Sequence, residues 1–271
     1  MIEPDVPADY GPATYGDAFA DVYDDWYADI SDVEATVDAI TRLSGGESVL
    51  ELGIGTGRLA LPLAARGIPV VGVDASQAML DLLAAKPGSD TIATVLADMA
   101  ELPIGDKTET LNACGPYAVA FAAFNTFFNL TTDEAQNACL RALFDLVRPD
   151  GLVVIEGFVP PPGGLDDGGV SVRDITPDGA VLTVSKHDAE HQVIRGHHVE
   201  ITSAGNRLRP WMLHYRTPEQ LDTAATAAGF VLDTRWTDWA GTPFPTQGDP
   251  HESADSSLAL PDVHVSVYRR L

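Results

Sequence analysis

The stretch that decides the fold of this chain is Val49-Leu50-Glu51-Leu52-Gly53-Ile54-Gly55-Thr56-Gly57-Arg58. A short apolar run ends in a carboxylate, and three glycines follow at alternate positions. The apolar residues after them have the length of a helix, so the order reads as strand, tight turn and helix. Glycine lets the backbone take a positive φ and approach a ligand closely. The free N–H groups at the start of the helix then suit an anionic ligand group.

Two further acidic residues end the next two apolar runs. Asp74 follows the run over residues 69–73, and Asp98 follows the run over 92–97, with Met99 directly after it. Strands that alternate with helices form a parallel sheet, whose ligands bind at the carboxyl ends of the strands. The glycine loop and both aspartates are therefore expected at one edge of the sheet.

These residues resemble motif I of the class I S-adenosylmethionine (AdoMet) methyltransferases, which reads acidic-x-Gly-x-Gly-x-Gly. The resemblance implies that S-adenosyl-L-methionine is the cofactor and S-adenosyl-L-homocysteine the product. It places Glu51 near the methionine moiety, Asp74 at the ribose hydroxyls, and Asp98 with Met99 at the adenine. Arg58 is a candidate partner of the AdoMet carboxylate, and a different role for it stays open.

Two other functions fit part of this pattern. Gly55-Thr56-Gly57-Arg58-Leu59-Ala60 also matches the dinucleotide fingerprint G-x-G-x-x-G/A, which an NAD-dependent oxidoreductase would use together with Asp74. Such an enzyme has no need of Asp98, which favours AdoMet. A non-catalytic AdoMet-binding protein would keep the same residues. The sequence holds no Gly-x-Ser-x-Gly elbow and no P-loop lysine, so acyl and phosphoryl transfer find no support.

Composition and charge narrow the classes of partner. The chain has 271 residues, of which 45% are hydrophobic, and 40 acidic residues against 16 basic ones give a net charge of −24. Such a chain repels phosphate backbones, so a nucleic-acid partner is disfavoured. No apolar run approaches the ~18 residues of a membrane span, and residues 1–30 lack a signal-peptide pattern. Two cysteines, Cys114 and Cys139, are too few for a disulfide framework, which favours the cytoplasm.

The remaining runs predict an α/β fold: a doubly wound, seven-stranded, Rossmann-like methyltransferase sheet with an antiparallel β insertion after strand 5. Ser31-Asp32-Val33-Glu34 reads as a capping box that begins a helix before the first strand. The expected parts are an N-terminal helical lid over 1–47, the AdoMet-binding core over 48–158, the insertion over 159–215, and a C-terminal completion of the sheet over 216–271. In the family, strand 7 is antiparallel and lies between strands 5 and 6, which implies the same here.

Aromatic residues at helical spacing mark the N-terminal region. Phe19, Tyr23 and Tyr27 predict a helix over residues 18–27, which either packs on the core or covers the cofactor. Small-molecule methyltransferases place N-terminal tyrosines at AdoMet, so the resemblance favours Tyr15, Tyr23 and Tyr27 as cofactor contacts.

The segment after the fourth strand bears on the methyl acceptor. Phe124-Asn125-Thr126-Phe127-Phe128-Asn129-Leu130 resembles the run that flanks the methyl group in small-molecule and peptide N-terminal methyltransferases. Over about residues 15–271 the chain is most similar to enzymes that methylate amino sugars, glycine or peptide N-termini. A small-molecule or peptide acceptor is therefore expected, with N-methylation favoured over O-methylation. By analogy with look-alike enzymes in which such an insertion mediates dimers, a homodimer stays open.

Methyl transfer depends mainly on alignment and on a dry pocket, and a hydroxyl nucleophile also needs a general base. His214 is the best base candidate, because it lies at the junction of insertion and core and titrates near neutrality. A structural role for His214 is the alternative. Asn125 and Tyr15 complete the predicted catalytic residues. The histidines at 187, 191, 197 and 198 lack a recognisable ligand set, so no metal is expected.

Two sets of residues make up the rest of the predicted site. The cofactor-binding residues are Tyr15, Tyr23, Tyr27, Glu51, Gly53, Ile54, Gly55, Thr56, Gly57, Arg58, Asp74, Ala75, Met79, Asp98, Met99, Phe124 and Asn125. The substrate residues are Phe128, Arg209, Trp211 and Arg216. Arginine binds carboxylate or phosphate groups well, although a structural role stays open for each of these side chains.

Overall fold

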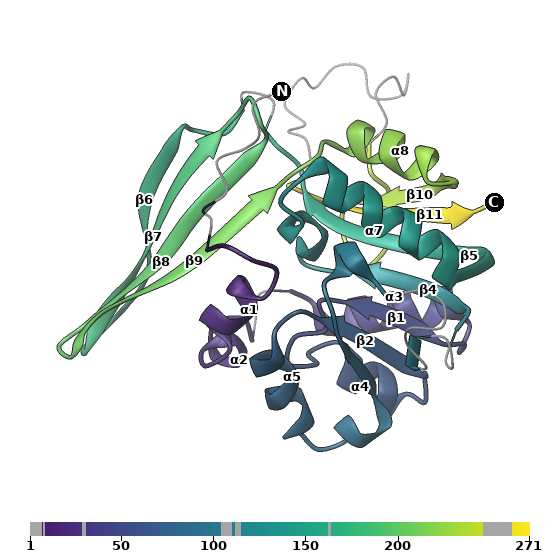
Figure 1. Ribbon diagram of the computed structural model, residues 1–271, viewed down its shortest axis with the longest axis horizontal. Helices are drawn as coiled ribbons and strands as arrows, with labels where there is room; N and C mark the ends of the chain where they lie inside the picture. The colour runs from purple at the N-terminus through teal and green to yellow at the C-terminus, as the bar shows by residue number, and fades with distance from the viewer. Residues whose placement is uncertain are drawn as a thin grey trace.

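The computed structural model describes residues 7, 9–28, 31–103, 110–111, 115–161, 164–245 and 262–271. Two sheets dominate the molecule, one of seven strands and one of four (Figure 1). Helices cover both faces of the larger sheet, and the smaller sheet stands to one side of it. Cys114 lies outside the described residues, and Cys139 is a buried free thiol.

The seven-stranded sheet has the strand order β10-β11-β5-β4-β1-β2-β3. Its members are β1 (Val49–Leu52), β2 (Val70–Asp74), β3 (Ala93–Leu96), β4 (Tyr117–Ala122), β5 (Val147–Phe158), β10 (Phe230–Trp236) and β11 (Val263–Arg270). Strands β1 to β5 are parallel, whereas β11 runs antiparallel between β5 and β10. The predicted fold class is confirmed, including the place of the last strand. Because β1 lies between β2 and β4, its carboxyl end is where a ligand crevice forms in such sheets.

Two apolar layers enclose this sheet. The helices are α3 (Val33–Ser44), α4 (Ala60–Ala65), α5 (Gln77–Ala84), α7 (Asp133–Leu146) and α8 (Pro218–Ala227). Ile40 and Leu63 pack in one layer, with α3, α4 and α5. Leu143 and Leu221 pack in the other, with α7 and α8. Strands buried on both faces are continuous apolar runs, which is why the sequence showed little alternation here.

The four-stranded sheet is an antiparallel meander in the order β6-β7-β8-β9. Its strands are β6 (Gly168–Thr176), β7 (Gly179–Asp188), β8 (Val193–Thr202) and β9 (Gly205–His214). Two-residue turns at 177–178 and 203–204 join β6 to β7 and β8 to β9. The predicted antiparallel insertion after strand 5 is thereby confirmed.

Three local expectations were wrong. Helix α3 is capped by the Asp32 side chain, which accepts from the backbone N–H of Ala35, whereas Ser31 accepts a hydrogen bond from Arg58. The sequence Arg148-Pro149-Asp150-Gly151 is typical of a turn and predicts one, yet these residues are part of β5, which begins at Val147. The expected helix over 18–27 is two short helices, α1 (Thr14–Phe19) and α2 (Tyr23–Trp26).

Three aspartates fasten residues 10–27 to three different parts of the molecule. From here on, 'the lid' means these residues, which are part of the 1–47 region expected from the sequence. Asp17 accepts a hydrogen bond of 2.6 Å from the Ser76 hydroxyl at the start of α5. Asp21 forms an ion pair of 2.6 Å with Arg209 of β9, and Asp24 one of 2.7 Å with Lys86 beyond α5. Part of the acidic excess therefore holds the lid in place and is not merely solvated surface.

Aromatic packing strengthens the contact between the lid and β8. The His198 ring lies 5.6 Å from the Phe19 ring and 5.9 Å from the Trp26 ring, between centroids. Its Nδ1 atom is 2.9 Å from the Thr183 hydroxyl. Burial, together with the positive charges of two nearby arginines, lowers the pKa of His198 to about 4. The imidazole is therefore neutral in the folded protein at physiological pH.

A substitution at Gly72 of β2 tests how tightly the glycine loop packs on this strand. A Cβ at Gly72 would lie 2.1 Å from Cδ1 of Ile54, whereas a Cβ at Gly169 of β6 meets nothing within 4 Å. We expect Gly72→Ala to lower the free energy of unfolding by about 1–3 kcal/mol, because overpacking forces the loop to shift. Gly169→Ala is the matched control and should change it little. Urea denaturation measures both, and equal stabilities for the two variants would contradict this packing.

His198 gives the fold an acid sensitivity. The folded imidazole takes up a proton only near pH 4, whereas an unfolded histidine does so below about pH 6.5. The unfolded state therefore binds more protons between these values, and the free energy of unfolding falls as pH drops through this window. In His198→Gln we expect the free energy of unfolding to fall less than in the wild type between neutral pH and about pH 5. Urea denaturation at the two pH values measures this difference. His197→Gln, at the exposed neighbour, should behave as wild type; the same fall in both variants would refute the assignment.

Candidate active site

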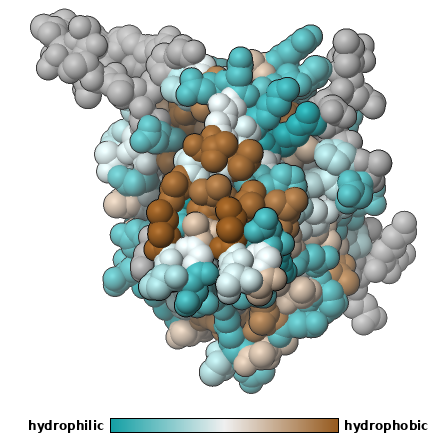
Figure 2. Space-filling model, turned by 90° about the vertical axis from the view of Figure 1, so that its left-hand side faces the viewer, coloured by the Kyte–Doolittle hydropathy of each residue, from teal (hydrophilic) through white to brown (hydrophobic). Residues whose placement is uncertain are grey.

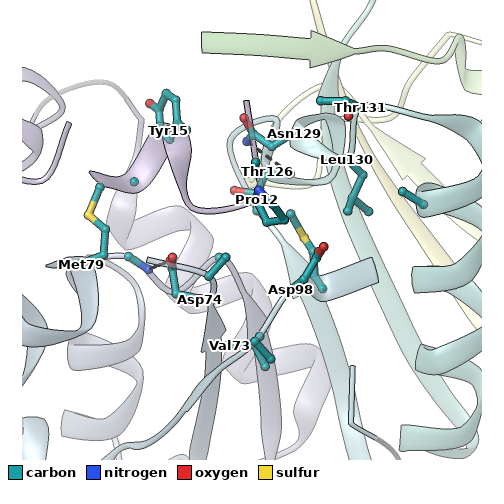
Figure 3. A pocket seen from close by; sticks show the side chains of 18 of the residues that line it. Pro12, Tyr15, Val73, Asp74, Met79, Asp98, Thr126, Asn129, Leu130 and Thr131 are labelled. Carbon is teal, nitrogen blue, oxygen red and sulfur yellow. Dashed lines mark hydrogen bonds between the residues drawn. The ribbon is translucent and has the colours of Figure 1, made fainter. Parts of the chain in front are cut away.

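A cavity opens under the lid at the carboxyl ends of β1, β2 and β3 (Figure 3). The lid lines it with Tyr10, Gly11, Pro12, Tyr15, Gly16 and Tyr23. The sheet edge adds Gly53, Gly55, Val73, Asp74, Ala75, Met79, Ala97, Asp98 and Met99, and the segment after β4 adds Thr126, Asn129, Leu130, Thr131 and Ala135. Residues far apart in the sequence thus enclose one space.

The glycines of the loop meet different constraints. Gly53, Gly55 and Gly57 all have positive φ, of 65°, 55° and 83°. A Cβ at Gly53 would lie 2.5 Å from the Thr126 side chain, and one at Gly57 would lie 2.4 Å from the Leu83 side chain. A Cβ at Gly55 would meet no atom nearer than 3.9 Å. Gly53 and Gly57 therefore permit close packing, while Gly55 keeps its backbone open to the cavity.

Asp74 joins the end of β2 to the glycine loop. Its carboxylate accepts backbone hydrogen bonds of 2.8 Å from Gly55 and 2.9 Å from Ser76. Burial raises the pKa of Asp74, and these backbone donors work against that shift. Each carboxylate oxygen can accept a second hydrogen bond, so the side chain has capacity left for a ligand that lies in the cavity.

Glu51 lies behind the loop and is 5% exposed. Its Oε2 atom has no hydrogen-bond partner among the described residues. Burial raises the pKa of Glu51 well above its usual value, and the positive charge of Arg58 works against this rise. A buried carboxylate with an unpaired oxygen is costly, so the site fits a cationic donor from a ligand.

Asp98 and Met99 form the opposite wall. The Asp98 side chain accepts a hydrogen bond of 2.8 Å from the backbone N–H of Ala100. Met99, Leu130 and Ala135 add apolar surface beside it. This wall presents one polar acceptor within apolar surroundings, which suits a flat heterocycle that carries an amino group.

Tyrosines of the lid form the roof. The Tyr15 ring stacks on Phe19 at 4.5 Å between centroids. Burial raises the pKa of Tyr23 to about 12 and that of Tyr15 well above its usual value, so both phenols keep their protons at neutral pH. Tyr27, which was also predicted to touch the cofactor, lies in a second layer with its ring 4.9 Å from that of Tyr23.

Several predicted cofactor residues do not line the cavity. The Ile54 side chain packs over Gly72, and the Thr56 hydroxyl donates to Asp24. Glu51, Gly57 and Arg58 also lie outside the lining set. Phe124 and Asn125 point elsewhere: the Oδ1 atom of Asn125 accepts from the backbone N–H of Phe158 at 2.8 Å. These residues shape the loops around the cavity.

The predicted base and substrate residues also lie outside this lining set. His214 is 7% exposed, its Nε2 atom is 3.8 Å from Asp133, and burial lowers its pKa. Phe128 is fully buried in the core. Arg209 is paired with Asp21 and Glu200, and Arg216 with Asp133, so these guanidinium groups are engaged within the protein. Trp211 lies over Gly196 of the small sheet.

Sequence reasoning missed part of the lining. Tyr10, Gly11 and Pro12 lie in a segment that looked irregular, and its Pro and Gly content gave no sign of a roof. Asn129 lies in the segment after β4, and its sequence context does not distinguish it from Asn125. Its Oδ1 atom is buried with no hydrogen-bond partner among the described residues, and its Nδ2 atom donates to the Thr126 carbonyl at 3.4 Å.

Two kinds of feature are absent from the described part of the chain. No group of three or more His, Cys, Asp or Glu side chains is placed to hold a metal ion. None of the helices is long and apolar enough to cross a membrane.

Parts of the chain are similar in sequence to known methyltransferases. A family model described as a methyltransferase domain matches residues 49–151. A demethylmenaquinone methyltransferase from Clavibacter sepedonicus is 32% identical over 129 residues, which cover 47% of each protein. A cypemycin N-terminal methyltransferase from a Streptomyces species is 30% identical over 147 residues, or 54% of this chain and 56% of that protein. The chain thus spans about half the length of the curated relatives it matches.

One solved structure is similar over nearly the whole chain. The CcbJ methyltransferase from Streptomyces caelestis is 35% identical with a TM-score of 0.80, and the alignment covers 96% of this chain and 99% of that one. Such a likeness extends beyond the nucleotide-binding core to the rest of the fold. Together with the glycine loop, Asp74 and Asp98 at one cavity, it shows that the chain belongs to the class I S-adenosylmethionine-dependent methyltransferases.

Proposed function

We propose that this protein transfers the methyl group of AdoMet to an amine nitrogen of a small molecule or a peptide. The observation that carries the proposal is the composition of the cavity. Two aspartates and a glycine loop lie at one end, and Asn129 offers an unpaired amide oxygen. No histidine is among the described residues that line it.

Asp74 and Asp98 mark out the cofactor end of the cavity, and Glu51 lies behind the glycine loop, outside the lining residues. When bound, AdoMet supplies an electrophilic methyl group on a sulfonium. Asp74 accepts from the ribose hydroxyls, and Asp98 accepts from the adenine amino group beside Met99. The unpaired Oε2 atom of Glu51 suits the ammonium group of the methionine moiety, because a cation there would offset the burial that raises the Glu51 pKa.

The absence of a base among the described lining residues favours nitrogen over oxygen as the acceptor. A hydroxyl needs a general base in the transition state, whereas a neutral amine needs only alignment. The lining phenols hold their protons, since burial raises the pKa of Tyr10 and of Tyr23 to about 12. Asp74 and Asp98 belong to the cofactor end. His214 does not enter the proposal, because it is not among the lining residues.

Asn129 is the residue we assign to the acceptor. Figure 3 places it beside Thr126 on the side of the cavity that faces the Tyr15 helix. Its Oδ1 atom would accept an N–H of the amine and leave the nitrogen lone pair free for the methyl group. The name of the cypemycin N-terminal methyltransferase supports an amine acceptor of this kind.

Other partners follow from charge and composition. The net charge of −24 supports a small or peptidic acceptor over nucleic acid, because phosphate backbones are repelled. The free thiol of Cys139 supports the cytoplasm as the compartment. A homodimer remains a prediction here.

Removal of the Asp74 carboxylate should weaken cofactor binding. Asp74→Ala loses both the proposed ribose contact and the hydrogen bond that positions Gly55, so we expect AdoMet affinity to fall by roughly ten- to a hundredfold. Asp90→Ala, at an exposed aspartate, is the control. Isothermal titration calorimetry with AdoMet and with NAD⁺ measures the change. Unchanged AdoMet affinity in Asp74→Ala would refute the site, and NAD⁺ binding would revive the oxidoreductase alternative.

Loss of the Asn129 amide should slow transfer without loss of the cofactor. We expect Asn129→Leu to lower the methylation rate by up to about tenfold, because the amine loses one neutral hydrogen bond. AdoMet affinity should stay close to wild type. Formation of S-adenosylhomocysteine with a panel of primary and secondary amines, an amino sugar and a short peptide measures the rate. Asn206→Leu on the small sheet is the control, and a full rate in Asn129→Leu would exclude the assigned role.

A further inference from the structure

The chain turns directly after β4 in a backbone conformation that side chains disfavour. Phe124 has a φ of 51° and Asn125 a φ of 59°, so two adjacent residues with side chains lie in the left-handed region. Asparagine tolerates this region, whereas a bulky aromatic residue rarely adopts it. Among the described residues, no other pair of adjacent non-glycine residues shares this conformation. Such strain persists only where the surrounding contacts enforce it, and it concentrates at functional sites.

Two hydrogen bonds with β5 enforce the turn. The Glu156 carboxylate accepts from the backbone N–H of Phe124, and the backbone N–H of Phe158 donates to Oδ1 of Asn125 at 2.8 Å. Strands β4 and β5 are parallel neighbours, so both bonds join their carboxyl ends. Each residue of the turn is thereby fastened to the same strand. Glu156 itself is 9% exposed, which shields its hydrogen bond from competing water.

The Phe124 ring gives a reason for a side chain at this strained position. The guanidinium carbon of Arg58 lies 5.9 Å from the centroid of this ring, and the Tyr27 ring meets it edge-on at 6.0 Å between centroids. Arg58 follows the glycine loop, and Tyr27 belongs to the lid. A glycine would relieve the strain but would remove both contacts. The turn is therefore the point at which β5, the glycine loop and the lid meet.

The residues that follow the turn line the cofactor cavity. They form the short 3-10 helix η3 (Thr126–Asn129), whose first and last residues are both in the lining. The Thr126 side chain packs on the glycine loop, where a Cβ at Gly53 would lie 2.5 Å from Cγ2 of Thr126. Asn129 donates to the Thr126 carbonyl, and Figure 3 shows the two residues together at the cavity. Because the turn sets the direction in which η3 leaves β4, it decides where the amide of Asn129 lies.

We propose that Glu156 is a positioning residue for methyl transfer. It holds the strained turn from β5 and thereby keeps Asn129 in the place from which its amide reaches the acceptor. Glu156 is not among the described residues that line the cavity, so it acts through the turn and not on the substrate. An apolar residue in its place would leave the Phe124 N–H without this partner, and the turn would relax. The inference rests on the proposed function, because the step that it concerns is the transfer of the methyl group.

Substitutions at Glu156 separate its hydrogen bond from its bulk. In Glu156→Leu we expect kcat, with the amine that the wild type methylates fastest, to fall by about ten- to a hundredfold, because a displacement of about 1 Å can cost that much. Glu156→Gln keeps an oxygen that accepts from Phe124 and should stay within about threefold of the wild type. AdoMet affinity, measured by calorimetry, should change little in either variant. Glu219→Leu, at an exposed glutamate of α8, is the control.

Two results at this position would overturn the proposal. One is a full rate in Glu156→Leu, and the other is a Glu156→Gln protein as slow as Glu156→Leu. Asn125 provides a second test, since it holds the same turn. Either single loss frees the turn, so the variant with leucine at both positions should be about as slow as the slower single variant. If the two losses multiply instead, the residues act independently and the assigned role is wrong.

Amide exchange tests the turn without any acceptor. Hydrogen–deuterium exchange over residues 123–130, measured by mass spectrometry, should be faster in Glu156→Leu than in the wild type and unchanged in Glu156→Gln. Strand β7 of the small sheet, on the side of the molecule that Figure 2 shows, is the internal reference and should exchange equally in all three proteins. Equal exchange over 123–130 in all three would overturn the positioning role. A wild type that binds AdoMet and methylates no amine, with the expected exchange pattern in the variants, would count against the proposed function alone.

Discussion

The hydrogen bond from the Gly55 backbone to the Asp74 carboxylate is the interaction on which the site depends. It ties the glycine loop, whose glycines have left-handed backbone conformations, to the end of β2. Because Asp74 also accepts from Ser76, the same carboxylate sets the start of α5. Ser76 in turn donates to Asp17 of the lid. One half-buried acid therefore aligns the floor, one wall and the roof of the cavity, and partial burial at this position raises its pKa.

The lid and the small sheet act as one unit around that floor. Arg209 is 1% exposed, although sequence reasoning gave it to the substrate. A buried guanidinium must be paired, and its partners here are carboxylates of the lid and of β8. The arginine thus positions the roof tyrosines through the lid backbone. In this way a remote sheet contributes to the shape of a cavity that it does not itself line.

The sequence predicted the parts of the structure that follow from periodicity and from glycine chemistry. The alternating strands and helices of the core, the insertion and the cavity positions of Gly53, Gly55, Asp74 and Asp98 rest on such local signals, whereas the place of the last strand followed from the resemblance to the family. The sequence could not predict which polar side chains find partners within the protein. Asn125 was preferred to Asn129, yet the fold gives the Asn125 amide a backbone partner and leaves the Asn129 oxygen unpaired. That difference depends on how β5 ends, which no local pattern encodes.

The three aspartates of the lid have a consequence for turnover. Release of a roof latched at Asp17, Asp21 and Asp24 would uncover the cavity beneath it. Gating steps of this kind often set the pace of an enzyme in place of the chemistry. Dissolved salt screens ion pairs at exposed carboxylates such as Asp21 and Asp24. Higher ionic strength is therefore expected to weaken two of the three contacts that hold the lid over the cavity.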